Sequence, residues 1–362
     1  MSKRISILSA IAAFLCAVTL FSCKKEVVLI PPATTPYIPP VIRNFRSLPE
    51  NPDNPMTLEG IALGKRLFFD PILSLDSTIS CSSCHKKENS FSDPSVRSSG
   101  VGGTLGKRHS IALINLAWQK DRFFWDGRAA SLQEQAKMPI EDPLEMHLPI
   151  TQAVQRLQRQ PGYIDLFWKA FGTKTVSEGL VTKALEQFER SLISYNTRFD
   201  RYLRSEGTLS DAELRGLQIF TTEKGDCFHC HSTAAPEVFI SPDRTFANNG
   251  LDSVSAANDF VDLGLGKFTG NPSDNGRFKI PALRNLAFSN PYMHDGRFAT
   301  LDEVIDFYNE GPKGSPTLEP IMREKANKRV ETTGFWGLNL STQDKADLKA
   351  FLLSFTDSSF VE

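Results

Sequence analysis

A five-residue pattern, in which two cysteines enclose two other residues and a histidine follows, occurs twice in this chain. The copies are CSSCH at residues 81–85 and CFHCH at residues 227–231. With 6 cysteines and 6 histidines in 362 residues, chance would produce about 0.002 matches to this haem-attachment pattern. Two thiols on one helical turn reach the two vinyl groups of a single haem, and the adjacent histidine faces the iron. The chain is therefore predicted to carry two covalent haem c groups.

Other uses of these cysteines fit the pattern less well. Four cysteines in an exported chain can form two disulfides, but two complete motifs would then be a coincidence. A zinc site is disfavoured because each pair already brings its own histidine and the pairs lie far apart in the chain. We expect the haems to be attached through Cys81, Cys84, Cys227 and Cys230, with His85 and His231 as the proximal ligands of the two irons.

The N-terminus has the pattern of an export signal. Lys3 and Arg4 precede an apolar run over residues 5–20, and Cys23 follows directly after a serine. We interpret residues 1–22 as a bacterial lipoprotein signal peptide and Cys23 as the lipidated first residue of the mature chain. A soluble secreted form and an uncleaved anchor are the alternatives, although the apolar run is short for a membrane-spanning helix. We expect a periplasmic protein of a Gram-negative bacterium, held to the membrane by lipid alone.

Composition and an internal repeat indicate the domain organisation. The chain is 40% hydrophobic with a formal net charge of −1, which suits two ordinary domains and gives no sign of a nucleic-acid partner. Residues 23–44 are rich in proline and are interpreted as an extended tether. A short helix ending in an aromatic residue is predicted before each cysteine motif, at residues 60–68 and 214–220. We therefore expect two tandem cytochrome c domains, at residues 45–205 and 206–362.

The remaining patterns favour an all-α fold. Apolar residues recur at helical spacing through residues 175–195, and Pro161-Gly162 divides residues 151–171 into two short helices. Capping boxes predict three further helix starts, after Ser210, Thr300 and Ser341. No strand-rich stretch is present in the sequence. The expected fold is thus two helical domains, each wrapped on a covalent haem c.

Several strings outside the cysteine motifs carry more specific information; they cover residues 123–136, 139–146, 281–285 and 291–296. Together with the two motifs they resemble the bacterial di-haem cytochrome c peroxidases and their relatives of the MauG type. The resemblance implies that the haem on His85 reacts with peroxide, while the haem on His231 takes up electrons and passes them on. It also implies four catalytic residues, namely Trp125 between the haems, Glu145 over the reactive iron, and Gln135 and Pro139 in the distal pocket.

The chemistry of peroxide cleavage is consistent with the role implied for Glu145. A base must take a proton from the inner peroxide oxygen, and an acid must return it to the outer oxygen. One carboxyl group can do both if it lies within hydrogen-bonding distance. Glu145 follows Pro143 and Leu144, and an apolar setting would raise its pKa and ease this exchange. Glu145 alone could equally be a surface or capping carboxylate.

The sequence departs from many di-haem peroxidases after the first motif. Their loop histidine, which blocks the reactive iron, has no counterpart in residues 97–106. The iron on His85 is therefore expected to be five-coordinate, as in the MauG type. His109 could be an iron ligand or a polar loop or interface residue, and it falls where the family usually has an asparagine that ligates calcium. Carbonyl oxygens at positions matching Ser289 and Pro291 complete that calcium site, but imidazole is a poor ligand for a hard cation.

A second departure concerns the far side of the second haem. Classical members place a methionine fourteen residues after the histidine of the HDG motif, where this chain has Tyr308, as MauG does. A phenolate favours ferric iron and a thioether favours ferrous iron. Tyr308 is therefore expected to ligate the second iron, and Met293 is its rival.

The expected function is reduction of H2O2 with electrons from a small cytochrome c or copper protein. The enzyme alternative is a MauG-like, peroxide-dependent oxidation of a protein or organic substrate. The non-enzyme alternative is a di-haem electron-transfer cytochrome. Family members often form homodimers, but the sequence leaves the oligomeric state of this chain open.

Overall fold

The structure is a computed structural model that describes residues 30–43, 45, 47–119, 122–231 and 246–362. Residues 33–362 form one compact unit, and the preceding unit is described only at its exposed residues 30–32. The predicted signal peptide and Cys23 therefore lie outside the described residues. Within the described residues, no helix combines the length and the apolar character needed to cross a bilayer.

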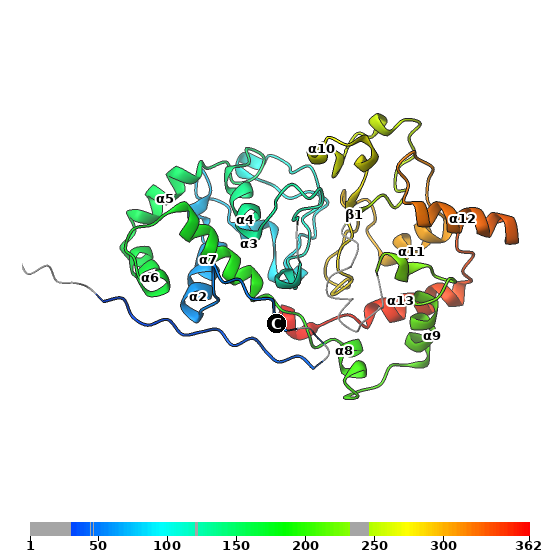
Figure 1. The fold of residues 1–362 in the computed structure, drawn as a ribbon, viewed down its shortest axis with the longest axis horizontal. Coiled ribbons are helices and arrows are strands. Elements are labelled where there is room, and N and C mark those ends of the chain that lie inside the picture. The colour runs from blue at the N-terminus through cyan, green and yellow to red at the C-terminus, as the bar shows by residue number, and fades with distance from the viewer. Residues whose placement is uncertain (1–29, 44, 46, 120–121, 232–245) are drawn as a thin grey trace, which may run out of the picture. The chain divides into compact units, whose positions relative to one another are not determined.

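The regular secondary structure of the described chain is almost entirely helical, which confirms the predicted all-α class (Figure 1). The helices are α2 (Leu58–Phe69), α3 (Cys81–Cys84), α4 (Leu132–Glu141), α5 (Ile150–Gln158), α6 (Pro161–Phe171), α7 (Glu178–Arg190), α8 (Arg198–Leu203), α9 (Asp211–Phe220), α10 (Gly266–Thr269), α11 (Leu301–Glu310), α12 (Pro320–Thr333), α13 (Thr342–Leu353) and α14 (Ser358–Val361). The strands β1 (Phe246–Ala247) and β2 (Phe278–Lys279) form a two-stranded antiparallel sheet.

The first hydrophobic core lies in the N-terminal half, where α2 packs against α7. These two helices approach most closely at Gly64, because a Cβ atom there would lie 1.9 Å from the carbonyl oxygen of Ala184. One turn later, the ring of Phe68 lies 5.1 Å from that of Phe188. Helices α4, α5 and α6 complete this half around the same core.

The second core repeats this arrangement in the C-terminal half, where α9 packs against α13 (Figure 1). A Cβ atom at Gly216 would lie 2.0 Å from the carbonyl oxygen of Asp347, and the ring of Phe220 lies 5.4 Å from that of Phe351. Each half is thus built on the same pair, a helix with glycine and phenylalanine four residues apart and a partner helix later in the chain.

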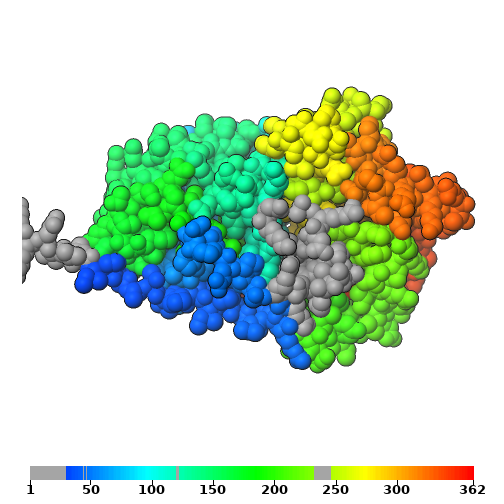
Figure 2. All heavy atoms as spheres, in the orientation of Figure 1, coloured from blue at the N-terminus to red at the C-terminus, as the bar shows by residue number. Residues whose placement is uncertain are grey.

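The predicted helix starts at Ser210, Thr300 and Ser341 are confirmed, each with both hydrogen bonds of a capping box. The break at Pro161 is also confirmed, between α5 and α6. Helices α4, α8 and α12 were not expected. Only Ala326 is buried in α12, which lies at the surface in orange in Figure 2, so no apolar periodicity marks that helix in the sequence.

The described part of the predicted tether contacts the folded unit at the start of α2 and again at Ile42, which is buried against Trp118 and Ile193. Pro36 forms an isolated bridge with Thr57, and the Tyr37 N–H donates to the Met56 carbonyl oxygen at 2.9 Å. The Thr35 hydroxyl group donates to the carboxylate of Glu59 at 2.9 Å. This contact holds the segment against the start of α2.

Candidate active site

The first cysteine motif occupies one short helix. Cys81 and Cys84 begin and end α3, and His85 follows directly. The His85 Nδ1 lies 2.9 Å from the carbonyl oxygen of Phe91, which can only accept a hydrogen bond, so Nδ1 carries the hydrogen. Burial lowers the pKa of His85 and keeps the ring neutral. Its Nε2 therefore presents a free lone pair, as an iron ligand requires.

Glu145 lies beside this helix, on a loop that folds back onto the C-terminus of α4. Its backbone N–H donates to the Asp142 carbonyl oxygen at 3.0 Å. Burial raises the pKa of the Cys81 and Cys84 thiols, and the nearby Glu145 carboxylate adds to this effect. Burial, with a contribution from Asp142 and an opposing one from Arg128, raises the pKa of Glu145 to about 7. A carboxyl group with this pKa can both accept and release a proton near neutral pH.

Residues 97–106, the loop in which other family members have a histidine that blocks the iron, pack against the backbone of Glu145. The Val101 N–H donates to the carbonyl oxygen of Glu145 at 2.9 Å. A Cβ atom at Gly100 would lie 2.1 Å from the Leu144 carbonyl oxygen, so this glycine permits the close approach. The loop therefore braces the backbone that carries Glu145.

Gln135 and Pro139 lie four residues apart on α4, on one face of the helix. The Gln135 side chain is 7% exposed, and its Oε1 has no hydrogen-bond partner among the described residues. Pro139 lacks an N–H, so it cannot bond to the Gln135 backbone carbonyl one turn earlier. An unpaired buried amide oxygen is costly, and this marks Gln135 as a side chain that a ligand could satisfy.

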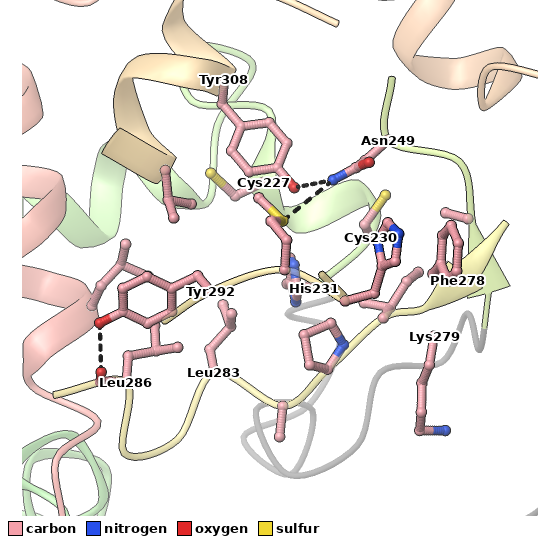
Figure 3. Close-up of a pocket in the computed structure, with 18 of the residues that line it drawn as sticks. Cys227, Cys230, His231, Asn249, Phe278, Lys279, Leu283, Leu286, Tyr292 and Tyr308 are labelled. Carbon is pink, nitrogen blue, oxygen red and sulfur yellow. Dashed lines mark hydrogen bonds between the residues drawn. The ribbon is translucent and has the colours of Figure 1, made fainter. Parts of the chain in front are cut away.

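The second motif lies in a cavity of the C-terminal half (Figure 3). Cys227, Cys230 and His231 all line it. Burial lowers the pKa of His231 to about 4, so its imidazole is neutral and able to ligate iron.

Tyr308 and Met293, the two rival ligands of the second iron, both line this cavity. The Asn249 side chain donates to the Tyr308 hydroxyl oxygen at 3.1 Å and lies 3.8 Å from the Met293 sulfur (Figure 3). Burial raises the pKa of Tyr308 to about 12, while the Asn249 hydrogen bond acts in the opposite direction. Asn249 was not identified from the sequence, because no motif surrounds it.

Trp125 connects the two halves. Its indole N–H donates to the His109 carbonyl oxygen at 2.8 Å, and its own carbonyl oxygen accepts from the backbone N–H of Lys279 at 2.8 Å. The Trp125 side chain also lines the second cavity. The residue predicted to lie between the haems is thus on the wall of one haem cavity and bonded to elements of both halves.

A second internal repeat, which was not recognised from the sequence, relates the two sites. Residues 126–128 and 295–297 both read Asp-Gly-Arg, and both glycines have φ +70°. In each turn the aspartate Oδ1 accepts from the arginine N–H, at 3.3 Å and 3.2 Å. Each turn then leads into a helix capped by a hydroxyl side chain, Ser131 for α4 and Thr300 for α11. The shared string Asp-Gly-Arg-x-Ala-Ser/Thr-Leu is the signal that could have revealed it.

The repeat pairs residues of the first site with residues of the second. Trp125 corresponds to His294, which stacks on Phe278 at 3.5 Å and lines the second cavity. Pro139 corresponds to Tyr308, since each is the eighth residue of its helix. One helix thus presents a ring without a donor or acceptor, and its counterpart presents a phenol.

A third cluster lies next to the second motif. The His229 Nε2 is 3.1 Å from the Asp226 carboxylate and 3.4 Å from that of Glu223. Within the described chain, this is the one histidine and carboxylate group with metal-ligand spacing. Lys325 and Arg329 pair with the two acids at 2.7 Å and 3.0 Å. The cluster therefore forms a salt-bridge network that holds α12 on the second motif.

Comparison with known proteins gives consistent matches along the chain. A family model described as di-haem cytochrome c peroxidase matches residues 58–208. The methylamine utilization protein MauG of Methylorubrum extorquens is 39% identical over 315 residues, which cover 86% of this chain and 82% of that protein. The cytochrome c551 peroxidase of Nitrosomonas europaea is 35% identical, covering 67% of this chain and 71% of that protein. The crystal structure of a MauG-like protein associated with microbial copper homeostasis matches with a TM-score of 0.76 and 32% identity, covering 90% of this chain and 97% of that one.

Proposed function

Because the chain belongs to the di-haem cytochrome c peroxidase and MauG family, a family of peroxidase-type oxidoreductases, we propose that it reduces H2O2 to water at its first haem site. Two electrons and two protons enter for each H2O2, and two water molecules leave. A small cytochrome c or copper protein supplies the electrons through the second site. The feature that carries this proposal is the half-buried Glu145 carboxyl group beside the first cysteine motif, whose pKa burial raises to about 7.

The residues of both motifs fit covalent haem. The thiols of Cys81 and Cys84 lie one helical turn apart, as attachment requires. His85 and His231 are neutral imidazoles, as proximal ligands must be. When bound, haem iron binds a peroxide oxygen and transfers electrons to it.

Glu145 handles the proton in this proposal. Its carboxylate takes the proton from the inner oxygen of H2O2, and the resulting carboxylic acid returns it to the outer oxygen, which leaves as water. The unpaired Oε1 of Gln135 accepts a hydrogen bond from the bound peroxide. Pro139 offers no polar atom, so it leaves the first distal side open.

Tyr308 closes the second site in the same proposal. Its position on α11 matches that of Pro139 on α4, and it faces the cavity that holds His231. The hydrogen bond from Asn249 favours the phenolate that an iron ligand must be. Trp125, bonded to both halves, provides the path for electrons between the two haems.

The MauG-like alternative also has support from one residue. A phenolate at the second iron favours the ferric state and makes that haem less suited to storing an electron. With Tyr308 in this role, the first site could instead oxidise a protein or organic substrate at the expense of peroxide. The rate of peroxide consumption, measured with and without a reduced cytochrome c, distinguishes the two functions. A peroxidase consumes peroxide only while it oxidises the cytochrome, whereas a substrate oxidase needs its own substrate instead.

The cellular setting belongs to the same proposal. We place the protein in the periplasm, anchored by a lipid on Cys23 at the start of the Pro-rich tether of residues 23–44. Its proposed haem-binding domains comprise residues 45–205 and 206–362, although Phe199 of α8, before that boundary, packs in the second core. Mass spectrometry of the N-terminal peptide tests the lipid on Cys23.

Glu145→Gln tests the proposed proton transfer. The amide keeps the size of the side chain but cannot accept a proton, so peroxide turnover should fall by about 10²–10⁴-fold. Both haems should remain attached, as measured by the pyridine haemochrome spectrum. Glu88→Gln, at an exposed carboxylate three residues after His85, should leave turnover unchanged. Turnover of Glu145→Gln at the wild-type rate would contradict the role of Glu145.

A further inference from the structure

The structure disagrees with the calcium site that the family resemblance implies between the two halves. That site would use an asparagine oxygen at position 109 and the carbonyl oxygens of Ser289 and Pro291. Position 109 holds a histidine, and its side chain is only 4% exposed. Calcium takes oxygen ligands, so the question is what the buried imidazole does among these carbonyl groups.

The His109 ring is a hydrogen-bond donor to the backbone carbonyl groups that surround it. Its Nδ1 lies 3.2 Å from the carbonyl oxygen of Ser95, which can only accept, so Nδ1 carries a hydrogen. The carbonyl groups of Val96 and Ser289 also interact with the ring, although burial has the largest effect and lowers the pKa of His109. On the other side, its Nε2 lies 3.1 Å from the Ser92 hydroxyl oxygen. The ring thus places an N–H against the Ser95 carbonyl oxygen, beside the Ser289 carbonyl group, where a cation would need oxygen ligands instead.

The backbone of His109 joins the same elements. Its N–H donates to the carbonyl oxygen of His294 at 2.9 Å, and its carbonyl oxygen accepts from the Trp125 indole at 2.8 Å. Ser92, Ser95 and Trp125 belong to the first half, whereas Ser289 and His294 belong to the second. One residue thus makes, with hydrogen bonds, the connection that a shared cation would make.

We infer that His109 takes the place of calcium between the two halves, so that the protein binds no calcium there and couples its haem sites through a metal-free hydrogen-bond network. This inference does not depend on which substrate the first site oxidises or reduces. It concerns the same interface that holds Trp125, so its readouts are metal content and stability rather than turnover.

The experiment uses the full-length holoprotein and two variants. Elemental analysis after dialysis should find no calcium above buffer in the wild type, and its thermal midpoint should be the same in EGTA and in calcium chloride. His109→Asn restores the amide oxygen, so it should bind calcium and gain a higher midpoint when calcium is added, because a ligand that binds only the native state stabilises it. His147→Asn changes an exposed histidine at φ +53°, a conformation that asparagine tolerates, and should stay insensitive to calcium.

Retention of one calcium per wild-type chain, or a lower wild-type midpoint in EGTA, would overturn the inference. A folded His109→Asn protein that binds no calcium would also overturn the role assigned to His109. If His109→Asn does not fold, the two wild-type measurements still decide whether the interface is metal-free. Because haem content and peroxide turnover are not the readouts, failure here is distinguishable from failure of the proposed peroxidase activity.

Discussion

Two carboxyl groups near the first motif, the half-buried Glu145 and the buried Glu189, have different surroundings. Glu145 has a pKa of about 7 and lies on a loop, while Glu189 is 3% exposed within α7. Burial, with a contribution from Glu186, raises the pKa of Glu189 to about 8, and its Oε2 has no hydrogen-bond partner among the described residues. In the proposed function, Glu145 exchanges protons with peroxide. Glu189, in a packed helix, holds its proton at neutral pH.

Glu189 should make stability depend on pH in a defined direction. In the unfolded chain it ionises near pH 4.5, whereas in the folded protein it keeps its proton up to about pH 8. Its stabilising effect is therefore complete below pH 4.5 and is lost as the pH rises towards 8, by up to about 1.4 kcal/mol per pH unit.

Glu189→Gln should remove this dependence, because an amide cannot ionise. Thermal midpoints measured at pH 5 and pH 8 should differ less in the variant than in the wild type. Glu178→Gln, at an exposed position on the same helix, should behave as the wild type does. An equal pH dependence in Glu189→Gln and the wild type would show that this carboxyl group does not contribute.

At the level of elements, two related helices differ at one position, and the proposed function assigns the difference between the two sites to it. The Asp-Gly-Arg turns and capped starts of α4 and α11 are alike, whereas the eighth residues of the two helices are Pro139 and Tyr308. Proline at position 139 presents no polar group, and tyrosine at position 308 presents a hydroxyl group already oriented by Asn249.

Tyr308→Met should raise the midpoint potential of the second haem, because a thioether favours ferrous iron and a phenolate favours ferric iron. Redox titration of each haem measures this. Tyr292→Phe is the matched control, since Tyr292 lines the same cavity but its hydroxyl group donates to the Leu286 carbonyl oxygen at 2.7 Å. If Met293→Leu alone shifts the potential and Tyr308→Met does not, Met293 is the ligand.

The sequence predicted the helices whose boundaries or packing depend on residues close together in the chain. The starts of α9, α11 and α13 follow from capping side chains, and the glycine that permits α2 to meet α7 lies in a repeat visible in the sequence. Helix α4 was missed because Pro139 interrupts its pattern, and α12 because its packing relies on salt bridges such as Lys325–Glu223. The partnership of Asn249 with Tyr308 could not be predicted, because it joins residues 59 apart in the chain.

At the scale of the whole molecule, buried polar side chains fix the two halves to each other. Arg284 is 1% exposed and donates two hydrogen bonds to Asp200, at 2.8 Å and 2.6 Å. The adjacent Asn285 donates to the Ser90 hydroxyl oxygen at 3.0 Å and accepts from the Asp357 N–H at 2.7 Å. The Asn285–Ser90 bond connects the segment before the second Asp-Gly-Arg turn to the loop that follows His85. The Arg284–Asp200 pair holds the same segment to α8.

Asp200→Asn should destabilise the protein by about 3–5 kcal/mol, because it leaves the Arg284 cation buried without its counterion. The free energy of unfolding in urea provides the measurement. Asp302→Asn breaks the exposed pair with Lys349, whose side chains are 61% and 36% exposed, and should cost no more than about 1 kcal/mol. Similar losses in the two variants would argue against a special role for the buried pair.

We propose that two haem sites built on one repeated unit are unequal, the first open to peroxide beside Glu145 and the second closed by Tyr308. Electron paramagnetic resonance of the ferric holoprotein, recorded before and after addition of H2O2, tests this most directly. We predict one high-spin, five-coordinate haem whose signal changes with peroxide, and one low-spin, six-coordinate haem. Two low-spin signals that do not respond to peroxide would contradict the proposal of one open and one closed haem site.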